Sequence, residues 1–178
     1  MRYVLLIIIL VVAVLSLMIY AYRQKRSAQP MEVNVLMTAY ANQAVERARR
    51  EYSKGLDYSP SSIEQVESIL SKLYEKRLAH ALSEDQLNEE VNTWGAYVGE
   101  VAKRVRPGAW QRDSKVSGKD AMPLVHDARN ETYPLAWVYK RITNGPEDNV
   151  WSKFQLTYSR EKFKQIDLNE PLKEAGRK

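Results

Sequence analysis

The chain has 178 residues and no cysteine, which excludes thiol nucleophiles but leaves the cellular compartment open, because domains on either side of a membrane can do without disulfides. Its formal net charge is +5, but four of its 27 basic residues flank an apolar N-terminal run, so the rest of the chain has 23 basic and 22 acidic residues. This balance argues against a nucleic-acid-binding protein, which would need a concentrated basic face.

The N-terminal run, residues 3–22, is uncharged and mostly large and apolar. A helix of about 20 residues, at about 1.5 Å per residue, matches a hydrocarbon core of about 30 Å, so the run predicts a transmembrane helix. A cleaved signal peptide fits less well, because the small pair Ser27 and Ala28 follows a basic cluster with Arg26 directly before it. A buried helix of a soluble domain would show a polar face, which this run lacks.

The flanks of the run indicate its orientation. Three basic residues follow it, whereas Arg2 and the α-amino group precede it. The excess of positive charge on the C-terminal side predicts a cytoplasmic location for the rest of the chain. The same basic cluster is suited to contact anionic lipid.

A polar linker, residues 23–31, precedes a predicted helix over residues 32–54. Alanines favour helix in this stretch, and apolar residues recur on one side of it. Gly55 is suited to the position after the helix, with Leu56 next to it for the hydrophobic contact of a helix-ending motif. The helix also contains a basic run, Arg47, Arg49 and Arg50. This run predicts a face exposed to solvent.

A second helix is predicted from Ser59 and Pro60, as N-cap and first helical residue, to Leu82. Ser83 and Gln86 then have the spacing of a capping box for a third helix. Six apolar residues of this third helix alternate in steps of four and three, which predicts one narrow buried stripe: Leu87, Val91, Trp94, Val98, Val101 and Val105.

Two glycines lie inside the third helix, Gly95 and Gly99, four residues apart and beside the apolar stripe. Each costs about 1 kcal/mol in a helix interior relative to alanine. We expect the close approach of another backbone to compensate for this cost, with a helix or a sheet directly on the glycine groove. Pro107 and Gly108 are expected to end the helix.

Short segments separated by turn residues follow, and they predict a small antiparallel meander over residues 109–113, 122–127 and 131–133. Pro134 opens a further predicted helix, and Asn144 and Gly145 end it. A last helix is predicted over residues 149–162.

The expected organisation is a transmembrane helix at residues 3–22, the linker at residues 23–31, a soluble domain at residues 32–163 and a polar tail at residues 164–178. The expected fold class is α+β, with one N-terminal transmembrane helix and a compact, mainly helical domain that carries a small antiparallel sheet.

Few residues suggest catalysis, and we expect no metal and no cofactor. The two histidines, His80 and His126, have no helical spacing that would pair them as metal ligands. No serine lies in a G-x-S-x-G setting, and no phosphate-binding loop is present. The pair Gly95 and Gly99 lies within a helix rather than at a strand-to-helix turn, which excludes a dinucleotide fingerprint.

The best candidates for partner binding are Tyr97, Glu100 and Arg104, which steps of three and four place on one side of the third helix, away from the glycine groove. They would form a charged, aromatic patch for another protein. The simpler alternative is an exposed ion pair between Glu100 and Arg104, with Tyr97 at the margin of the core.

The tryptophans and one group of basic residues could each also form a binding surface. The four tryptophans are expected in the core or at its edge rather than in an aromatic binding platform: Trp94, Trp110, Trp137 and Trp151. A basic group is the best candidate for an anionic surface, with lipid headgroups or nucleic acid as its ligand: Lys103, Arg104, Arg106, Arg112, Lys115 and Lys119.

The segment W-G-A-Y-V-G-E-V at residues 94–101, the later Trp110 and the K-R-I sequence at residues 140–142 resemble a bacterial domain family of unknown function. Members of that family pair a G-A-Y-x-G-E-V helix with a tryptophan-bearing strand and a later K-R-I helix. The likeness extends over residues 56–163. It implies a small α+β domain in bacteria, and it implies no activity or catalytic residue.

The leading hypothesis is a non-enzymatic, membrane-tethered module of the bacterial inner membrane that binds another protein. An immunity or toxin-neutralising protein held at the membrane is an alternative that small size and tethering suggest. A less favoured alternative is a hydrolase or transferase that uses Glu100, His126 or Asp127, which would require these side chains to converge in a cleft.

Overall fold

The computed structural model describes residues 16, 18, 32–127 and 130–167. The chain divides into two units, Met1–Glu32 and Val33–Lys178, and the fold below is that of the second unit.

In the described part of the chain, no helix combines the length and the hydropathy that crossing a bilayer requires. The predicted transmembrane segment, residues 3–22, lies outside that part except for Ser16 and Met18, which are helical and exposed. The linker at residues 23–31 and the residues beyond 167 also lie outside it.

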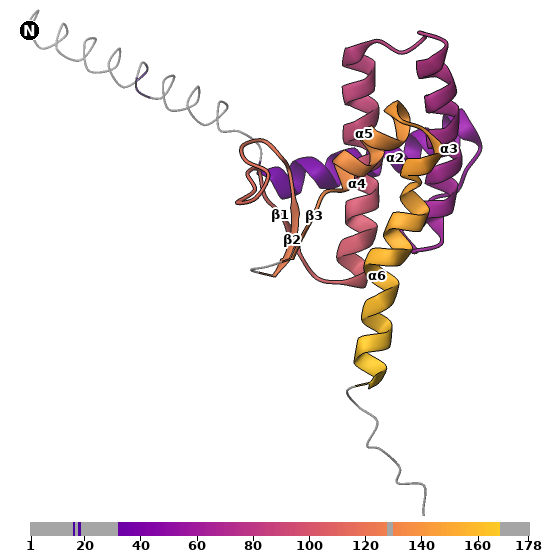
Figure 1. Cartoon of the computed structure of the whole chain (residues 1–178). Helices are drawn as coiled ribbons and strands as arrows, with labels where there is room; N and C mark the ends of the chain where they lie inside the picture. The colour runs from indigo at the N-terminus through magenta and orange to yellow at the C-terminus, as the bar shows by residue number, and fades with distance from the viewer. Residues whose placement is uncertain (1–15, 17, 19–31, 128–129, 168–178) are drawn as a thin grey trace, which may run out of the picture. The chain divides into compact units, whose positions relative to one another are not determined.

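Helices make up most of the second unit (Figure 1). Helix α4 lies at the centre and packs against both α2 and α5, while α3 packs against α5 and α6. This mainly helical architecture with a small sheet confirms the predicted α+β class. The bounds are α2 (Val33–Tyr52), α3 (Ser62–Leu78), α4 (Glu84–Val105), α5 (Pro134–Thr143), the 3-10 turn η1 (Pro146–Asp148) and α6 (Val150–Asp167). The last helix is thus longer than predicted.

The predicted meander is present as a three-stranded antiparallel sheet in the order β1-β2-β3. Its strands are shorter than predicted: β1 (Ala109–Trp110), β2 (Leu124–Asp127) and β3 (Asn130–Thr132). Trp110 pairs with Leu124, and Leu124 pairs with Thr132 on the other side. The register shifts between Val125 and Asp127, as at a β-bulge.

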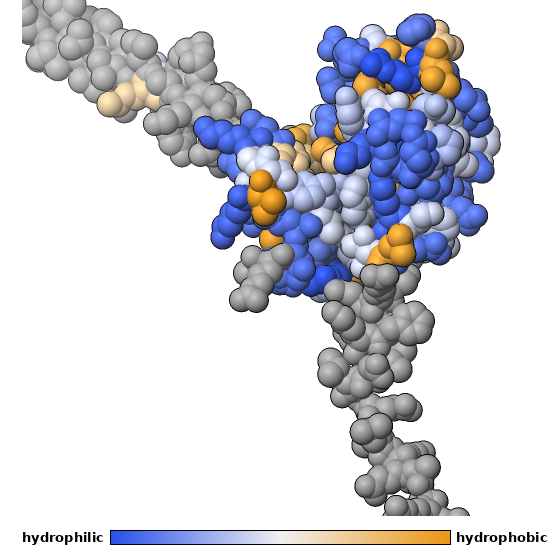
Figure 2. Space-filling view, viewed as in Figure 1, coloured by the Kyte–Doolittle hydropathy of each residue, from blue (hydrophilic) through white to orange (hydrophobic). Residues whose placement is uncertain are grey.

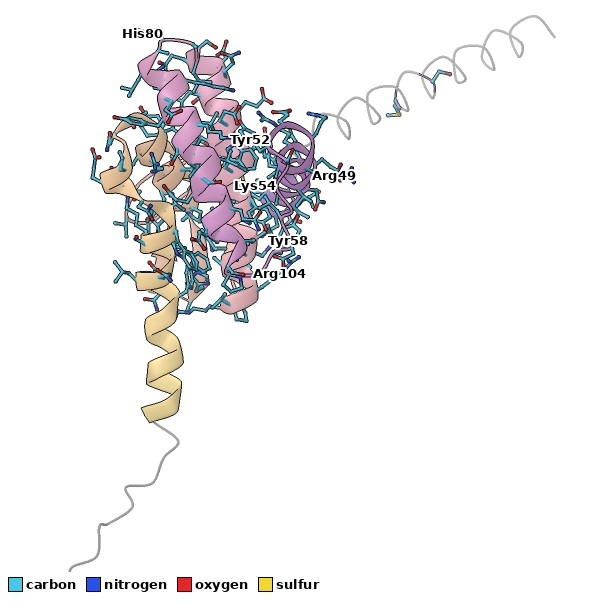
Figure 3. The ribbon with its side chains drawn as sticks, turned by 90° about the vertical axis from the view of Figure 1, so that its right-hand side faces the viewer. Arg49, Tyr52, Lys54, Tyr58, His80 and Arg104 are labelled. Atoms are coloured by element: carbon cyan, nitrogen blue, oxygen red, sulfur yellow. The ribbon has the colours of Figure 1, made fainter. Side chains whose placement is uncertain are left out.

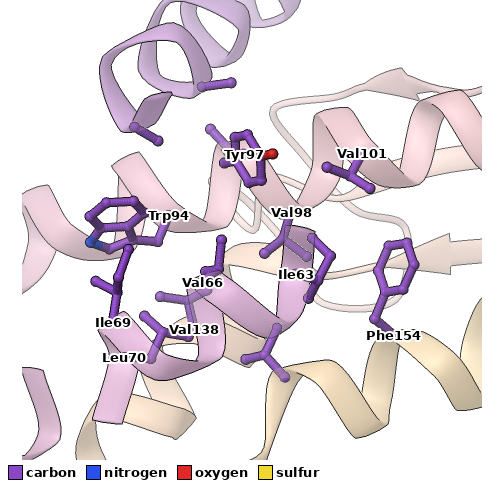
Figure 4. Packing of buried hydrophobic residues seen from close by; sticks show 14 of the residues in the cluster. Ile63, Val66, Ile69, Leu70, Trp94, Tyr97, Val98, Val101, Val138 and Phe154 are labelled. Carbon is purple, nitrogen blue, oxygen red and sulfur yellow. The ribbon is translucent and has the colours of Figure 1, made fainter. Parts of the chain in front are cut away.

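The core is built on the apolar stripe of α4 (Figure 4). Trp94, Val98 and Val101 are fully buried, as predicted, and meet side chains of α3, α5 and α6. Val105 differs from the prediction, because it is 41% exposed in the last turn of α4. The predicted capping box is present: the Gln86 backbone N–H donates to Ser83 Oγ, and the Gln86 side chain accepts from the Ser83 N–H.

The glycine groove of α4 is filled, as predicted, by another backbone at one position. A Cβ atom added at Gly95 would lie 2.7 Å from Cα of Leu135, in the first turn of α5. At Gly99 the neighbour is a side chain, because an added Cβ would lie 2.0 Å from Cζ2 of Trp110. Gly95 therefore leaves room for the first turn of α5, and Gly99 leaves room for the indole ring of Trp110 from β1.

Helix ends differ from the predictions in three further places. Helix α2 ends at Tyr52, and the next residue, Ser53, has a positive φ of 53°. Ser53 therefore takes the helix-ending position that the sequence assigned to Gly55. Ser61, not Ser59, is the N-cap of α3, because a tight turn that starts at Ser59 precedes the helix. Helix α3 ends at Leu78 rather than at the predicted Leu82. After it, His80 takes the position that glycine usually fills, with φ of 53°.

Arg47 corrects the prediction of a solvated basic face on α2. Its side chain is only 12% exposed, and its Nη2 lies 2.6 Å from Oε1 of Glu90 on α4. The other oxygen of Glu90 accepts a hydrogen bond of 2.7 Å from Nε1 of Trp94. Arg49 and Arg50 are exposed as predicted, since their side chains are 78% and 70% exposed. Arg47 differs because α4 lies against its side of α2.

Candidate functional site

Tyr97 lies inside the domain rather than at the margin of its core, with no exposed surface. Its hydroxyl is 2.7 Å from Oγ of Ser62 on α3 and accepts a hydrogen bond of 2.9 Å from the backbone N–H of Tyr58. Burial raises the pKa of Tyr97, while the hydrogen bonds with Ser62 and Tyr58 act in the opposite direction. The side chain therefore cannot contact a partner directly, and it instead fixes the loop between α2 and α3.

Tyr58 is the residue of that loop that Tyr97 holds. Its backbone has φ of 61°, a left-handed conformation that is rare for a bulky side chain. Its ring stacks on the ring of Tyr97 with centroids 4.9 Å apart, and its hydroxyl donates a hydrogen bond of 2.8 Å to Oδ1 of Asn42 on α2. Burial raises the pKa of Tyr58. Backbone strain of this kind persists only where surrounding contacts fix it, and such strain is concentrated at functional sites.

Arg104 is exposed, and Figure 3 labels it near Tyr58. The centre of its guanidinium is 3.8 Å from the ring centroid, a cation–π distance. Within the described residues it forms no ion pair. The charge of Arg104 acts on Asp57, whose pKa is lowered mainly by the hydroxyl and N–H of Ser59 and, to a smaller degree, by Arg104.

Glu100 does not form the predicted ion pair with Arg104. It also does not lie away from the glycine groove, where its spacing predicts it. Its Oε1 accepts hydrogen bonds of 2.9 Å from Nζ of Lys103 and from Nε1 of Trp110, the residue that covers Gly99. Its side chain is 15% exposed. Glu100 therefore fixes Trp110 on α4 and leaves the guanidinium of Arg104 to Tyr58.

His126 and Asp127 follow one another in β2. Nδ1 of His126 faces the carbonyl oxygens of Arg106 and Pro107, at 3.0 and 3.3 Å, so this nitrogen carries a proton. Its Nε2 lies 2.8 Å from the hydroxyl of Tyr158 on α6. Asp127 accepts hydrogen bonds of 2.6 Å from Arg106 and from Asn130. Each of these contacts joins one part of the fold to another.

The candidate site is therefore a stack of three side chains from two segments, with Tyr97 at its base, Tyr58 in the middle and Arg104 outermost. The structure brings Tyr97 and Arg104 together, as their spacing predicts, and joins them through Tyr58. Sequence reasoning missed Tyr58. The turn residues around it, Asp57 and Ser59, indicate a loop, but no local pattern places a tyrosine between two residues of α4.

Among the residues that the structure describes, no group of three or more His, Cys, Asp or Glu side chains could hold a metal ion. His80 is exposed beyond the end of α3, where its backbone forms the helix-ending turn. Comparisons with protein-family models, curated proteins and solved structures found no match to this chain.

Proposed function

We propose that this chain is a non-enzymatic, membrane-tethered protein-interaction module of the bacterial inner membrane. Residues 3–22 are the anchor, because their length and hydropathy match the hydrocarbon core. The excess of basic residues after them supports a cytoplasmic position for the folded domain. The bacterial setting rests on the resemblance of residues 56–163 to the domain family with the G-A-Y-x-G-E-V helix.

The observation that carries the proposed interaction is the stacking of Arg104 on Tyr58. A guanidinium held over an aromatic ring can still offer N–H donors at its edge, and its planar fork matches a carboxylate through two hydrogen bonds. The partner is therefore a protein with an exposed aspartate or glutamate at its contact surface.

The stack also lowers the cost of binding. An exposed arginine normally loses much rotamer freedom when it is fixed, about 0.5–1.5 kcal/mol for a side chain of this kind. Tyr58 already holds Arg104, and the contacts of Tyr58 with Tyr97 and Asn42 hold the ring in turn. Arginine and tyrosine are also among the residues that contribute most to protein interfaces.

Recovery of the full chain from detergent-solubilised bacterial membranes tests this proposal. The wild-type chain should retain a partner in constant ratio, and Arg104→Glu should lose it, because the new carboxylate repels the acidic residue of the partner. Arg49→Glu is the matched control, since Arg49 is an exposed arginine of α2 that pairs with Glu46. The proposal fails if no partner is retained or if the two variants lose it equally.

Orientation needs a separate measurement. A reporter that is active only in the cytoplasm, fused after Lys178, should be active in intact cells. A reporter that is active only in the periplasm should be silent at the same position. The opposite pattern would place the domain outside the cytoplasm and would exclude every cytoplasmic partner.

A further inference from the structure

The loop between β1 and β2, residues 111–123, carries the most exposed large apolar side chain in the described part of the chain. Val116 is 84% exposed, whereas the others in that part reach at most 66%. Figure 2 shows a mostly hydrophilic face on which hydrophobic residues are scattered singly. An isolated exposed valine is ordinary by itself, so the setting of Val116 decides whether it has a role.

The first part of that setting is a fixed turn. Oγ of Ser114 accepts hydrogen bonds of 2.9 and 2.8 Å from the backbone N–H groups of Val116 and Ser117. The same hydroxyl donates to the carboxylate of Glu131 on β3, at 2.5 Å. Ser114 also pairs with Gly118 through two backbone hydrogen bonds, and Ser114 itself is buried. The turn therefore holds Val116 at its tip in one conformation.

The second part is charge. Lys115 and Lys119 flank the tip, are exposed and form no ion pair within the described residues. The acidic residues of the loop are engaged elsewhere, since Asp120 pairs with Arg112 and Asp113 accepts the backbone N–H of Asp120. The charge of Lys115 also acts on Glu131, whose pKa is lowered mainly by side-chain hydrogen bonds and to a smaller degree by this charge, but both lysines remain exposed. An apolar tip between two exposed lysines is complementary to the edge of an anionic bilayer, where the apolar group enters and the ammonium groups meet lipid phosphates.

The third part is the point where the polypeptide enters the domain. The side chain of Asn34, in the first turn of α2, bonds both the N–H and the carbonyl of Trp110, at 2.9 and 3.2 Å. The loop begins at the next residue, so it starts beside the entry of α2 (Figure 1). Residues 23–31 join this entry to the proposed anchor, and nine residues can extend at most about 30 Å.

We propose that the tip of this loop, Lys115, Val116 and Lys119, docks on anionic lipid headgroups of the membrane that holds residues 3–22. The inference rests on the membrane anchor of the proposed function. Each lysine near an anionic surface strengthens binding only about fivefold. The loop therefore docks because the tether keeps it at an effective concentration in the millimolar range.

The test uses the full chain in nanodiscs and a single cysteine, since the chain has none of its own. Ser117→Cys, next to the tip, carries a fluorescent label, and acrylamide, a neutral quencher, measures how accessible it is to water. Phosphatidylglycerol discs should reduce quenching at least about twofold relative to phosphatidylcholine discs, because only the former attract the lysines. Leu78→Cys, at an exposed position of α3, is the matched control and should show no difference.

Two variants with the label at Ser117→Cys assign the effect to the tip. Val116→Asp, and separately Lys115→Glu with Lys119→Glu, should each restore the quenching seen in phosphatidylcholine discs. Val116 and both lysines are exposed, so these changes leave the core intact, and unchanged quenching of each variant in detergent relative to the parent labelled chain confirms that the turn is retained. Protection that survives in either variant overturns the inference, as does equal quenching in the two kinds of disc.

The remaining outcomes separate this inference from the proposed function. If the chain enters the discs but the label stays fully accessible, the anchor stands and loop docking is wrong. If the chain fails to enter the discs, the proposed anchor itself is wrong. If protection instead arises in detergent as the protein concentration rises, the loop binds a second copy of the chain and the lipid inference is overturned.

Discussion

The carboxylate of Glu67 on α3 binds the guanidinium of Arg141 on α5, with 2.5 Å between Oε1 and Nε. The other carboxylate oxygen accepts the backbone N–H of Val150 at 2.8 Å, where α6 begins. Nη2 of Arg141 donates to Oγ of Ser71 at 2.6 Å. One buried acid thus joins three helices, and it also neutralises the positive end of the α6 dipole.

Removing this acid should destabilise the fold strongly. Glu67→Ala leaves Arg141 buried without its partner, so we expect a loss of about 3 kcal/mol in the free energy of unfolding. Glu46→Ala is the control, because its pair with Arg49 is exposed and is worth about 1 kcal/mol or less. Urea unfolding of the full chain in detergent, followed by tryptophan fluorescence, measures both. Equal losses would mean that the buried pair contributes no more than a surface pair.

The same pair permits a test of coupling. Replacing both residues by methionine should cost less than the sum of Glu67→Met and Arg141→Met, with a coupling of about 2 kcal/mol. Additive losses would show that the two charges contribute independently, contrary to the contact between them.

The glycine groove of α4 gives a second prediction. Gly99→Ala should gain about 1 kcal/mol in helix propensity but lose more, because the new methyl group would overlap the fully buried ring of Trp110. We expect a net loss of about 1–2 kcal/mol, measured by urea unfolding. Gly55→Ala is the control, since an added Cβ meets nothing within 4 Å there, and it should be neutral or slightly stabilising. A stabilised Gly99→Ala variant would mean that the ring moves aside at little cost.

The end of α3 offers a stabilising change. The N–H of Ala81 bonds the carbonyl of Lys76 and the N–H of His80 bonds that of Arg77, which is the Schellman arrangement. His80 occupies its left-handed position, where a Cβ costs about 1 kcal/mol. His80→Gly should therefore raise the free energy of unfolding by about 1 kcal/mol, whereas His80→Ala, which keeps the Cβ, should not. Equal effects of the two changes would mean that the imidazole, not the backbone, determines the stability of this turn.

Local patterns were sufficient to predict α4, because its period and its glycine pair lie within its 22 residues and its capping box starts at the residue directly before them. They also predicted that the glycine groove is covered. The covering residues could not be identified in this way, since Leu135 lies far along the chain and Trp110 arrives from a two-residue strand. Contacts between distant segments are set by the fold as a whole.

The charged residues show the same limit more sharply. Glu67 and Arg47 have polar side chains on helices, which favours a solvated position, yet both are nearly buried because each meets an opposite charge from another helix. Arg141 lies 74 residues from Glu67 in the sequence. At the candidate site, spacing correctly placed Tyr97 and Arg104 on one side of α4. Tyr97 is buried and Arg104 is exposed because Tyr58, from the loop before α3, lies between them.

Glu131 makes the loop between β1 and β2 sensitive to acid. Hydrogen bonds from Ser114 and then from the hydroxyl of Tyr133 hold the pKa of Glu131 below its ordinary value of 4.5. A carboxyl whose pKa is lowered by folding stabilises the fold fully above the ordinary value, and this contribution is lost as the pH falls through the lowered pKa. We therefore expect the turn around Ser114 to loosen only below pH 4.5.

A nitroxide label at Ser117→Cys in the full chain measures this loosening, because its mobility should rise as the pH falls through the lowered pKa of Glu131. Tyr133→Phe removes one of the two side-chain donors, so the pKa of Glu131 should move toward 4.5 and the transition should move to higher pH. Glu131→Gln should abolish the transition and leave the label mobile at every pH. An unchanged transition in Glu131→Gln would assign it to another acidic group, since the carboxylate that anchors Ser114 would then have no part in it.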